Sequence, residues 1–144
     1  MKYLLDVNVL VAWGWADHAD HRRAARWIGN ARKKGGTTLL TSAIPQLGFV
    51  RVSVQRTSGQ VSPEAASEVL SGMLGTLGAR HRFVPDDQPA AQWPAWCVVA
   101  ARTTDAHLLA LAKANGAELA TLDQGIPGAF LIGSDRVEAG DLGE

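Results

Sequence analysis

The chain has 144 residues, of which 47% are apolar and 19% are charged, and its formal net charge is zero. This length suits one packed domain, and the apolar content excludes an intrinsically disordered chain. No apolar run approaches the roughly 20 residues of a membrane-spanning helix, so no membrane association is expected. Cys97 is the only cysteine, which excludes an internal disulfide. Because the chain starts with a predicted strand and not with a secretory signal, we expect a cytoplasmic location.

The stretch of residues 2–12 begins with a short apolar run that ends abruptly at Asp6. A short apolar run followed by a carboxylate indicates a buried strand whose end reaches water. Ligand sites in open α/β sheets lie beyond the carboxyl ends of the strands, and an ionised Asp is seldom buried without a partner. Asp6 is therefore expected to need hydrogen-bond donors or a cation.

Apolar periodicity and turn residues predict the other elements of the first half of the chain. In chain order, we expect a short helix at residues 7–13, a longer helix from residue 17 or 18 to about residue 34, a strand at residues 37–41 and a helix at residues 43–54. The longer helix is predicted from an apolar stripe at helical spacing that consists of Ala24, Trp27, Ile28 and Ala31.

The second half continues the alternation of helices and strands. We expect a helix from Pro63 to Leu77, a strand at residues 81–84, a loop or irregular helix at 85–94, a helix at 105–115, a strand at 118–121 and a candidate fifth strand at 130–132. Ser62 is expected to cap the first of these helices, whose predicted core face is Ala66, Val69, Leu70, Met73 and Leu77. This alternation predicts an α/β fold, with a parallel sheet of four to five strands and helices on both faces. The predicted domain spans residues 1–132, and residues 133–144 form a C-terminal tail.

Three aspartates occupy equivalent places in this predicted fold. Asp6 ends the first strand, Asp105 opens a helix, and Asp123 follows the fourth strand. Carboxylates at such places converge on one rim of the sheet, where they repel each other unless they are protonated or bind a cation. Hard oxygen ligands suit Mg²⁺ or Mn²⁺, and such an ion can activate water and stabilise charge on a phosphodiester. Each aspartate alone also fits a role in capping or in a turn, but together they predict a shared metal site.

Basic side chains are concentrated in residues 1–56, which hold nine of them against three acidic ones. A basic surface of this kind can bind a polyanion such as RNA, although most charged runs are simply the solvated face of a helix. Arg22, Arg23 and Arg26 lie mostly off the apolar stripe of the longer helix and are candidates for RNA binding. Arg51 is a fourth candidate, for which a structural ion pair is the alternative.

Three segments resemble the PIN-domain nucleases, in particular the VapC-type toxins of toxin–antitoxin pairs. They read LLDVNVLVA, TSAIPQLGFVRV and TDAHLLALAKANGAELATLDQG, and the pairing of TDAHL with ATLD is the most specific part. The resemblance runs from about residue 2 to residue 132. It implies a parallel α/β sheet and an endoribonuclease that depends on Mg²⁺ or Mn²⁺ and hydrolyses RNA with metal-activated water. It also implies a cytoplasmic homodimer and a cognate antitoxin, a segment of which would cover the acidic site.

The resemblance assigns the catalytic and metal-binding positions residue by residue. Asp6, Asp105 and Asp123 match the three aspartates of the family. The family's glutamate, in the helix after the second strand, falls on Gln46, whose amide can ligate through oxygen but carries no charge. This departure leaves open the alternative that the chain is a PIN domain that binds RNA without cleaving it.

Three polar residues are expected to support this site. Asn8 would orient Asp6 or cap the short helix that follows it. Thr104 is expected to cap the helix that carries Asp105, and Thr121 is expected to be a strand residue next to Asp123.

Overall fold

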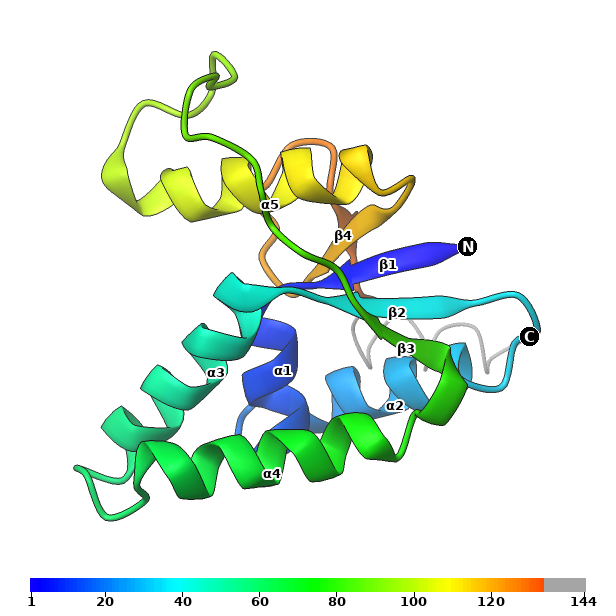
Figure 1. Cartoon of the computed structure of the whole chain (residues 1–144), viewed down its shortest axis with the longest axis vertical. Helices are drawn as coiled ribbons and strands as arrows, with labels where there is room; N and C mark the ends of the chain where they lie inside the picture. Colours follow the sequence, from blue (N-terminus) through cyan, green and yellow to red (C-terminus); the bar gives the residue numbers. More distant parts are fainter. Residues whose placement is uncertain (134–144) are drawn as a thin grey trace.

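Five strands form one parallel sheet in the computed structural model, which describes residues 1–133 (Figure 1). The strands are β1 (Lys2–Leu5), β2 (Thr38–Thr41), β3 (His81–Phe83), β4 (Glu118–Thr121) and β5 (Phe130–Leu131). Their spatial order is β3-β2-β1-β4-β5, and all four neighbouring pairs are parallel. The predicted parallel α/β sheet is therefore confirmed, including its fifth strand. Apart from Gly133, the predicted tail lies outside the described residues.

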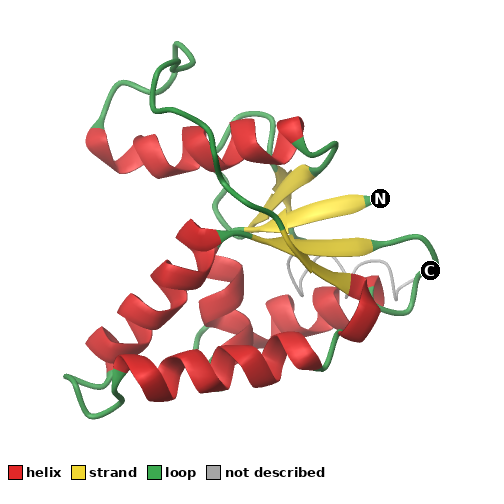
Figure 2. Cartoon of the chain, in the orientation of Figure 1, coloured by secondary structure: helices red, strands yellow, loops and turns green. Residues whose placement is uncertain are grey.

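Helices cover both faces of the sheet, as predicted, but they are divided unequally (Figure 2). They are α1 (Val7–Gly14), α2 (His21–Ala31), α3 (Ala43–Arg56), α4 (Pro63–Gly75) and α5 (Thr103–Ala114), with short 3₁₀ turns at Gly78–Arg80 and Ala100–Arg102. Helix α5 lies alone on one face, and α1 to α4 lie on the other. Within residues 1–133, no helix has both the length and the apolar character that crossing a membrane requires.

Alternation along the strands explains why the chain buries two separate apolar layers. Successive side chains of a strand point to opposite faces. Leu4 therefore packs in the layer under α5, which includes Leu108, whereas Leu5 packs in the layer that includes Val9 and Phe49. The next position, Asp6, returns to the face that α5 covers, so its carboxylate points toward the helix that carries Asp105.

The longer predicted helix is shorter in the structure than its apolar stripe suggested. Helix α2 begins at His21 and ends at Ala31, because residues 16–20 form turns in which the backbone N–H of Asp20 bonds to the His18 ring. The stripe itself is confirmed, since Ala24, Ile28 and Ala31 are buried. Trp27, the fourth member of the stripe, forms an aromatic cluster with Tyr3 and Phe130. The ring centroids of this cluster lie 5.1 to 5.8 Å apart. This cluster ties α2 to the sheet.

The cap of α4 is confirmed, but its core face is partly wrong. The Ser62 hydroxyl accepts a hydrogen bond of 3.0 Å from the backbone N–H of Ala65, as a cap does. Val69 was predicted to be in the core but is 52% exposed, and Leu74 is buried in its place. The buried stripe follows steps of four residues from Ala66, and these steps carry it away from Val69.

Candidate active site

The three predicted aspartates gather where the order of the sheet reverses. The chain builds β1, β2 and β3 outward in one direction and then adds β4 and β5 on the other side of β1. Ligands of open α/β sheets bind at this switch point, outside the carboxyl ends of the two central strands. Asp6 directly follows β1, Asp123 lies two residues beyond β4, and Asp105 lies in the first turn of α5.

Asp6 is the most buried of these carboxylates, with 5% of its surface exposed. Its Oδ1 accepts a hydrogen bond of 2.7 Å from the backbone N–H of Val7, and its Oδ2 accepts one of 2.8 Å from the Thr121 hydroxyl. Burial raises the pKa of Asp6 to about 6 even though both hydrogen bonds lower it, and the charges of Asp105 and Asp123 raise it further. The two hydrogen bonds therefore do not fully stabilise the ionised carboxylate in its buried position, and a bound cation would supply the missing positive charge.

A chain of hydrogen bonds joins Asp6 to the segment that carries Asp123. The Asn8 amide donates a hydrogen bond of 3.2 Å to the Thr121 hydroxyl and accepts one of 3.2 Å from the backbone N–H of Leu122. Thr121 also accepts a hydrogen bond of 3.1 Å from the backbone N–H of Asp123. Among the described residues, hydrogen bonds link Asn8 to Asp6 through Thr121, and α1 is capped by Asp6 itself.

Arg102 is a site residue that sequence reasoning missed. Its Nη1 lies 3.2 Å from Asp105 Oδ2 and 3.3 Å from Asp123 Oδ2, so one guanidinium pairs with two of the three carboxylates. A side chain at Gly125 would collide with this guanidinium, and the backbone N–H of Gly125 donates a hydrogen bond of 2.7 Å to Asp123. The pKa of Asp105 is raised by burial in spite of the hydrogen bond from Arg102, which lowers it. The signal in the sequence was a basic residue three positions before a first-turn aspartate.

A pocket of about 400 Å³ opens in front of Asp6 and Asp105. Its lining is Asp6, Val7, Asn8, Val11, His18, Arg51, Val52, Thr104 and Asp105. Thr104 lies here and does not cap α5, because that helix has Arg102 at its N-cap and no side-chain cap bond. Arg51 is the only one of the four candidate RNA-binding arginines in this lining, and His18 was not predicted to be there.

The structure does not bring Gln46 into this pocket. Its amide nitrogen donates a hydrogen bond of 3.0 Å to the Thr41 hydroxyl, and its side chain lines a groove between α3 and α4. Gln46 and Arg51 are five residues apart on one helix, which places them about 140° apart around its axis. The predicted place of Gln46 beside the three aspartates therefore has no support from the structure.

The arginines of α2 also lie outside the pocket lining. Arg23 is bound to the end of the sheet, because its Nε lies 3.0 Å from the carbonyl oxygen of Ile132, and its Nη1 pairs with Asp20. This arrangement gives Arg23 a structural role that the sequence did not reveal. Arg22 and Arg26 are exposed, and their binding to RNA stays a prediction.

The donor chemistry of the site fits a hard divalent cation. Among residues 1–133, no three or more His, Cys, Asp or Glu side chains form a ready-made metal cage, and Arg102 holds two of the three carboxylates. Two features favour a cation even so: the raised pKa of buried Asp6, and the Ser42 hydroxyl, which is buried without a partner in the described chain. Extending the register of β1 and β2 by two residues places Ser42 next to Asp6. Oxygen donors of this kind suit Mg²⁺ or Mn²⁺.

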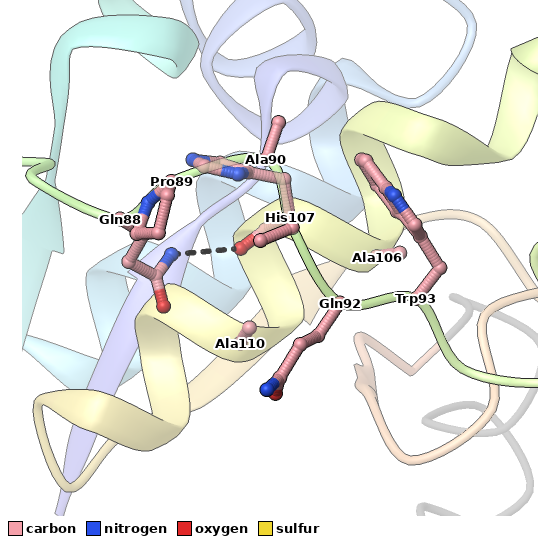
Figure 3. A pocket seen from close by; sticks show the side chains of 9 residues that line it. Gln88, Pro89, Ala90, Gln92, Trp93, Ala106, His107 and Ala110 are labelled. Atoms are coloured by element: carbon pink, nitrogen blue, oxygen red, sulfur yellow. Dashed lines mark hydrogen bonds between the residues drawn. The ribbon is translucent and has the colours of Figure 1, made fainter.

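A second pocket, of about 300 Å³, lies over α5 and shares no lining residue with the first (Figure 3). Gln88 and Trp93 stand on opposite sides of it, above Ala106 and Ala110 of α5. Some of the polar groups around it have partners within the chain. The Gln88 amide bonds to the carbonyl oxygen of His107, whose ring pairs with Asp86.

Comparison with known proteins shows which family the chain resembles. The model of the PIN domain family matches residues 3–129. Ribonuclease VapC39 of Mycobacterium tuberculosis is 39% identical over 127 residues, which cover 85% of this chain and 89% of that protein. Ribonuclease VapC38 of the same organism is 41% identical over 130 residues, which cover 85% and 86%.

Solved structures show the same fold at low sequence identity. The VapBC2 complex of Rickettsia felis, bound to a DNA fragment from its promoter, contains a chain with a TM-score of 0.57 at 17% identity, covering 91% of this chain and 97% of that one. VapC20 of Mycobacterium tuberculosis, a sarcin-ricin loop cleaving toxin, has a TM-score of 0.54 at 14% identity, covering 96% and 95%. The chain therefore belongs to the PIN domain family, and within it to the group of VapC ribonucleases.

Proposed function

We propose that this chain is the toxin of a toxin–antitoxin pair and acts as an endoribonuclease that depends on a divalent metal. The observation that carries this proposal is the meeting of Asp6, Asp105 and Asp123 at the switch point of the sheet, coupled electrostatically to one another. The relatives of about 40% identity that are named ribonucleases support the reaction class. Hydrolysis of an RNA phosphodiester follows as the proposed reaction.

Asp6, Asp105 and Asp123 are the residues proposed to hold Mg²⁺ or Mn²⁺. When bound, such an ion supplies activation of water and stabilisation of negative charge on a phosphodiester. Thr121 keeps the carboxylate of Asp6 in place through its hydrogen bond, and Asn8 keeps Thr121 in place. Because Asp6 is buried and fixed at the cap of α1, it serves as the rigid member of the set.

Arg51 is proposed to bind the RNA backbone beside these carboxylates. It is exposed on α3 and lines the same pocket as Asp6 and Asp105, so its guanidinium can reach a phosphate held there. Arg22 and Arg26, which are exposed on α2, are proposed to contact the RNA farther from the site. Arg23 is left out, because it holds the end of the sheet.

A cognate antitoxin and a second copy of the chain are the proposed protein partners. The Rickettsia felis chain of the same fold belongs to a VapBC complex, and by analogy a segment of an antitoxin would cover the carboxylate pocket of this chain. The groove between α3 and α4, of about 460 Å³, exposes Leu47 and Phe83 and is the surface proposed for a homodimer. The proposed location is the cytoplasm.

Expression of the chain without its partner tests the proposal. Growth should stop when the parent protein is induced, and Asp105→Asn should abolish this effect. Asp87→Asn is the matched control, because it makes the same change at an exposed aspartate of the loop before α5. If Asp105→Asn is as toxic as the parent at equal soluble level, the proposed metal-dependent nuclease is wrong.

One alternative function is motivated by Gln46. If the chain lacks a fourth acidic group, it could bind RNA without cleaving it. The purified protein would then retain labelled RNA in a binding assay but leave it intact in Mg²⁺ or Mn²⁺. Cleavage that is lost on Asp6→Asn would exclude this alternative.

A further inference from the structure

We propose that Arg102 is an internal counter-ion of the metal site, which pairs with Asp105 and Asp123 in the metal-free protein and is displaced when the divalent ion binds. This inference rests on the proposed function, because it concerns the same three carboxylates. It adds a residue to the site that is neither a ligand nor a substrate contact. Arg102 thereby sets the concentration of divalent ion at which the site is half-saturated.

The guanidinium of Arg102 lies between two carboxylates. A single nitrogen atom, Nη1, lies 3.2 Å from Asp105 Oδ2 and 3.3 Å from Asp123 Oδ2. It therefore stands between two carboxylates that come from different elements and that repel each other. A divalent ion shared by these aspartates would draw on the same two carboxylates, so the ion and Arg102 compete for them.

The surrounding backbone holds Arg102 in this position. It is the last residue of the 3₁₀ turn at Ala100–Arg102, directly before α5, and its guanidinium lies against Gly125. The absence of a side chain at Gly125 leaves the room that the guanidinium occupies. The 3₁₀ turn thus fixes the backbone of Arg102, and Gly125 leaves room for its guanidinium beside the two carboxylates.

The two ion pairs of Arg102 are weak enough for a divalent ion to replace them. The Arg102 side chain is 32% exposed, so its ion pairs are partly screened by water. A divalent ion brings twice the charge and closer contact to oxygen, and it can also use Asp6, which Arg102 does not contact among the described residues. Displacement of Arg102 is therefore favourable once the ion is abundant.

Calorimetric titration of the metal-free protein with Mn²⁺ tests this competition. Arg102→Met should lower the Kd for Mn²⁺ roughly three- to tenfold, because two partly exposed ion pairs no longer have to be broken. In EDTA, Arg102→Met should melt at a lower temperature than the parent, and saturating Mn²⁺ should narrow this difference.

Two other arginines provide matched controls. Arg56 pairs with Asp17 at 2.9 Å and its side chain is 30% exposed, so Arg56→Met removes a similar ion pair that involves none of the three aspartates and should leave the Kd unchanged. Arg51 lines the carboxylate pocket without a hydrogen bond to Asp6 or Asp105 in the described chain. Arg51→Met therefore removes a nearby positive charge without removing the competitor, and it should change the Kd less than twofold.

A second measurement does not depend on any variant. In the parent protein, titration with Mg²⁺ should shift the side-chain Nε–H signal of Arg102 in a ¹H–¹⁵N spectrum. The midpoint of this shift should equal that of the backbone N–H signals of Asp105 and Asp123. The Nε–H signal of Arg56 should stay in place.

The outcomes separate this inference from the proposed function. If the parent binds Mn²⁺ and cleaves RNA but Arg102→Met binds no more tightly, Arg102 is not a competitor and the inference alone is wrong. The inference also fails if Arg51→Met tightens binding as much as Arg102→Met does, because the effect is then that of any nearby charge. If neither the parent nor Arg102→Met binds Mn²⁺, both proposals are wrong.

Discussion

The surroundings of Asp6 have two opposite effects on the pKa of its carboxyl group. As the cap of α1 and the partner of Thr121, it accepts two hydrogen bonds that favour its ionised form. As a buried side chain near two other carboxylates, it is driven toward the protonated form, and this effect prevails. The ionisation of Asp6 therefore costs the metal-free protein stability, and a bound cation would reduce this cost.

This cost predicts how the stability of the metal-free protein depends on pH. Since the pKa of Asp6 is about 6 in the folded chain, against a usual value of 3.8, the folded state holds the proton more tightly than the unfolded state between about pH 4 and pH 6. The free energy of unfolding of the parent should fall relative to that of Asp6→Asn as pH rises through this window, by at most about 3 kcal/mol. Above about pH 6, the difference in the free energy of unfolding between the parent and Asp6→Asn should be constant. Urea unfolding of both proteins in EDTA measures it, and a difference that does not change with pH would show that Asp6 ionises normally.

At Gln46, the sequence match and the structure make different predictions for one substitution. The match places position 46 beside the metal, so Gln46→Glu should tighten the binding of Mn²⁺. The structure places the side chain in the groove between α3 and α4, bonded to Thr41, so the affinity should stay within twofold of the parent. We expect the second result in calorimetric titration. A several-fold gain in affinity would restore Gln46 to the site.

At the scale of elements, the position of the site depends on close packing of α1 against α3. A Cβ atom at Gly48 would lie 2.7 Å from both methyl carbons of Val7, the first residue of α1. Only glycine allows this approach, which holds the start of α1, and with it the capping carboxylate of Asp6, beside α3. Two elements far apart in the sequence are thus fixed by one missing side chain.

Gly48→Ala should therefore destabilise the protein, although alanine favours helices more than glycine does. The valine side chain is branched and stiff, so the collision should cost about 1 to 3 kcal/mol of the free energy of unfolding. Gly72→Ala in α4 is the control, since a Cβ there meets nothing within 4 Å, and it should stabilise the protein by roughly 0.5 to 1 kcal/mol. Urea unfolding of both variants tests the contact, and a Gly48→Ala protein as stable as the parent would exclude it.

At the scale of the whole molecule, alternation of strands and helices was enough to predict a parallel sheet with helices on both faces. The positions of Asp6, Asp105 and Asp123 at one rim followed from the same rule, because parallel strands end on the same edge. Arg102 and His18 were missed, since their place depends on how a turn and a loop fold back on the rim, which periodicity does not encode. Gln46 lies in the groove between α3 and α4 in the structure, a position that depends on how α3 is rotated and that its place in the chain does not reveal. The bounds of α2 failed for a similar reason, since local turns around His18 replaced its first helical turn.

The central claim is that the three aspartates at the switch point form a metal-dependent ribonuclease site. The most direct measurement is the cleavage of RNA by the purified parent, by Asp105→Asn and by the control Asp87→Asn, with Mn²⁺ or with EDTA. We predict that the parent and Asp87→Asn cleave RNA at the same positions in Mn²⁺ and leave it intact in EDTA, and that Asp105→Asn is at least about a hundredfold slower, as expected when a group that acts in the transition state is lost. Cleavage by the parent in EDTA, or equal cleavage by Asp105→Asn, would contradict the claim.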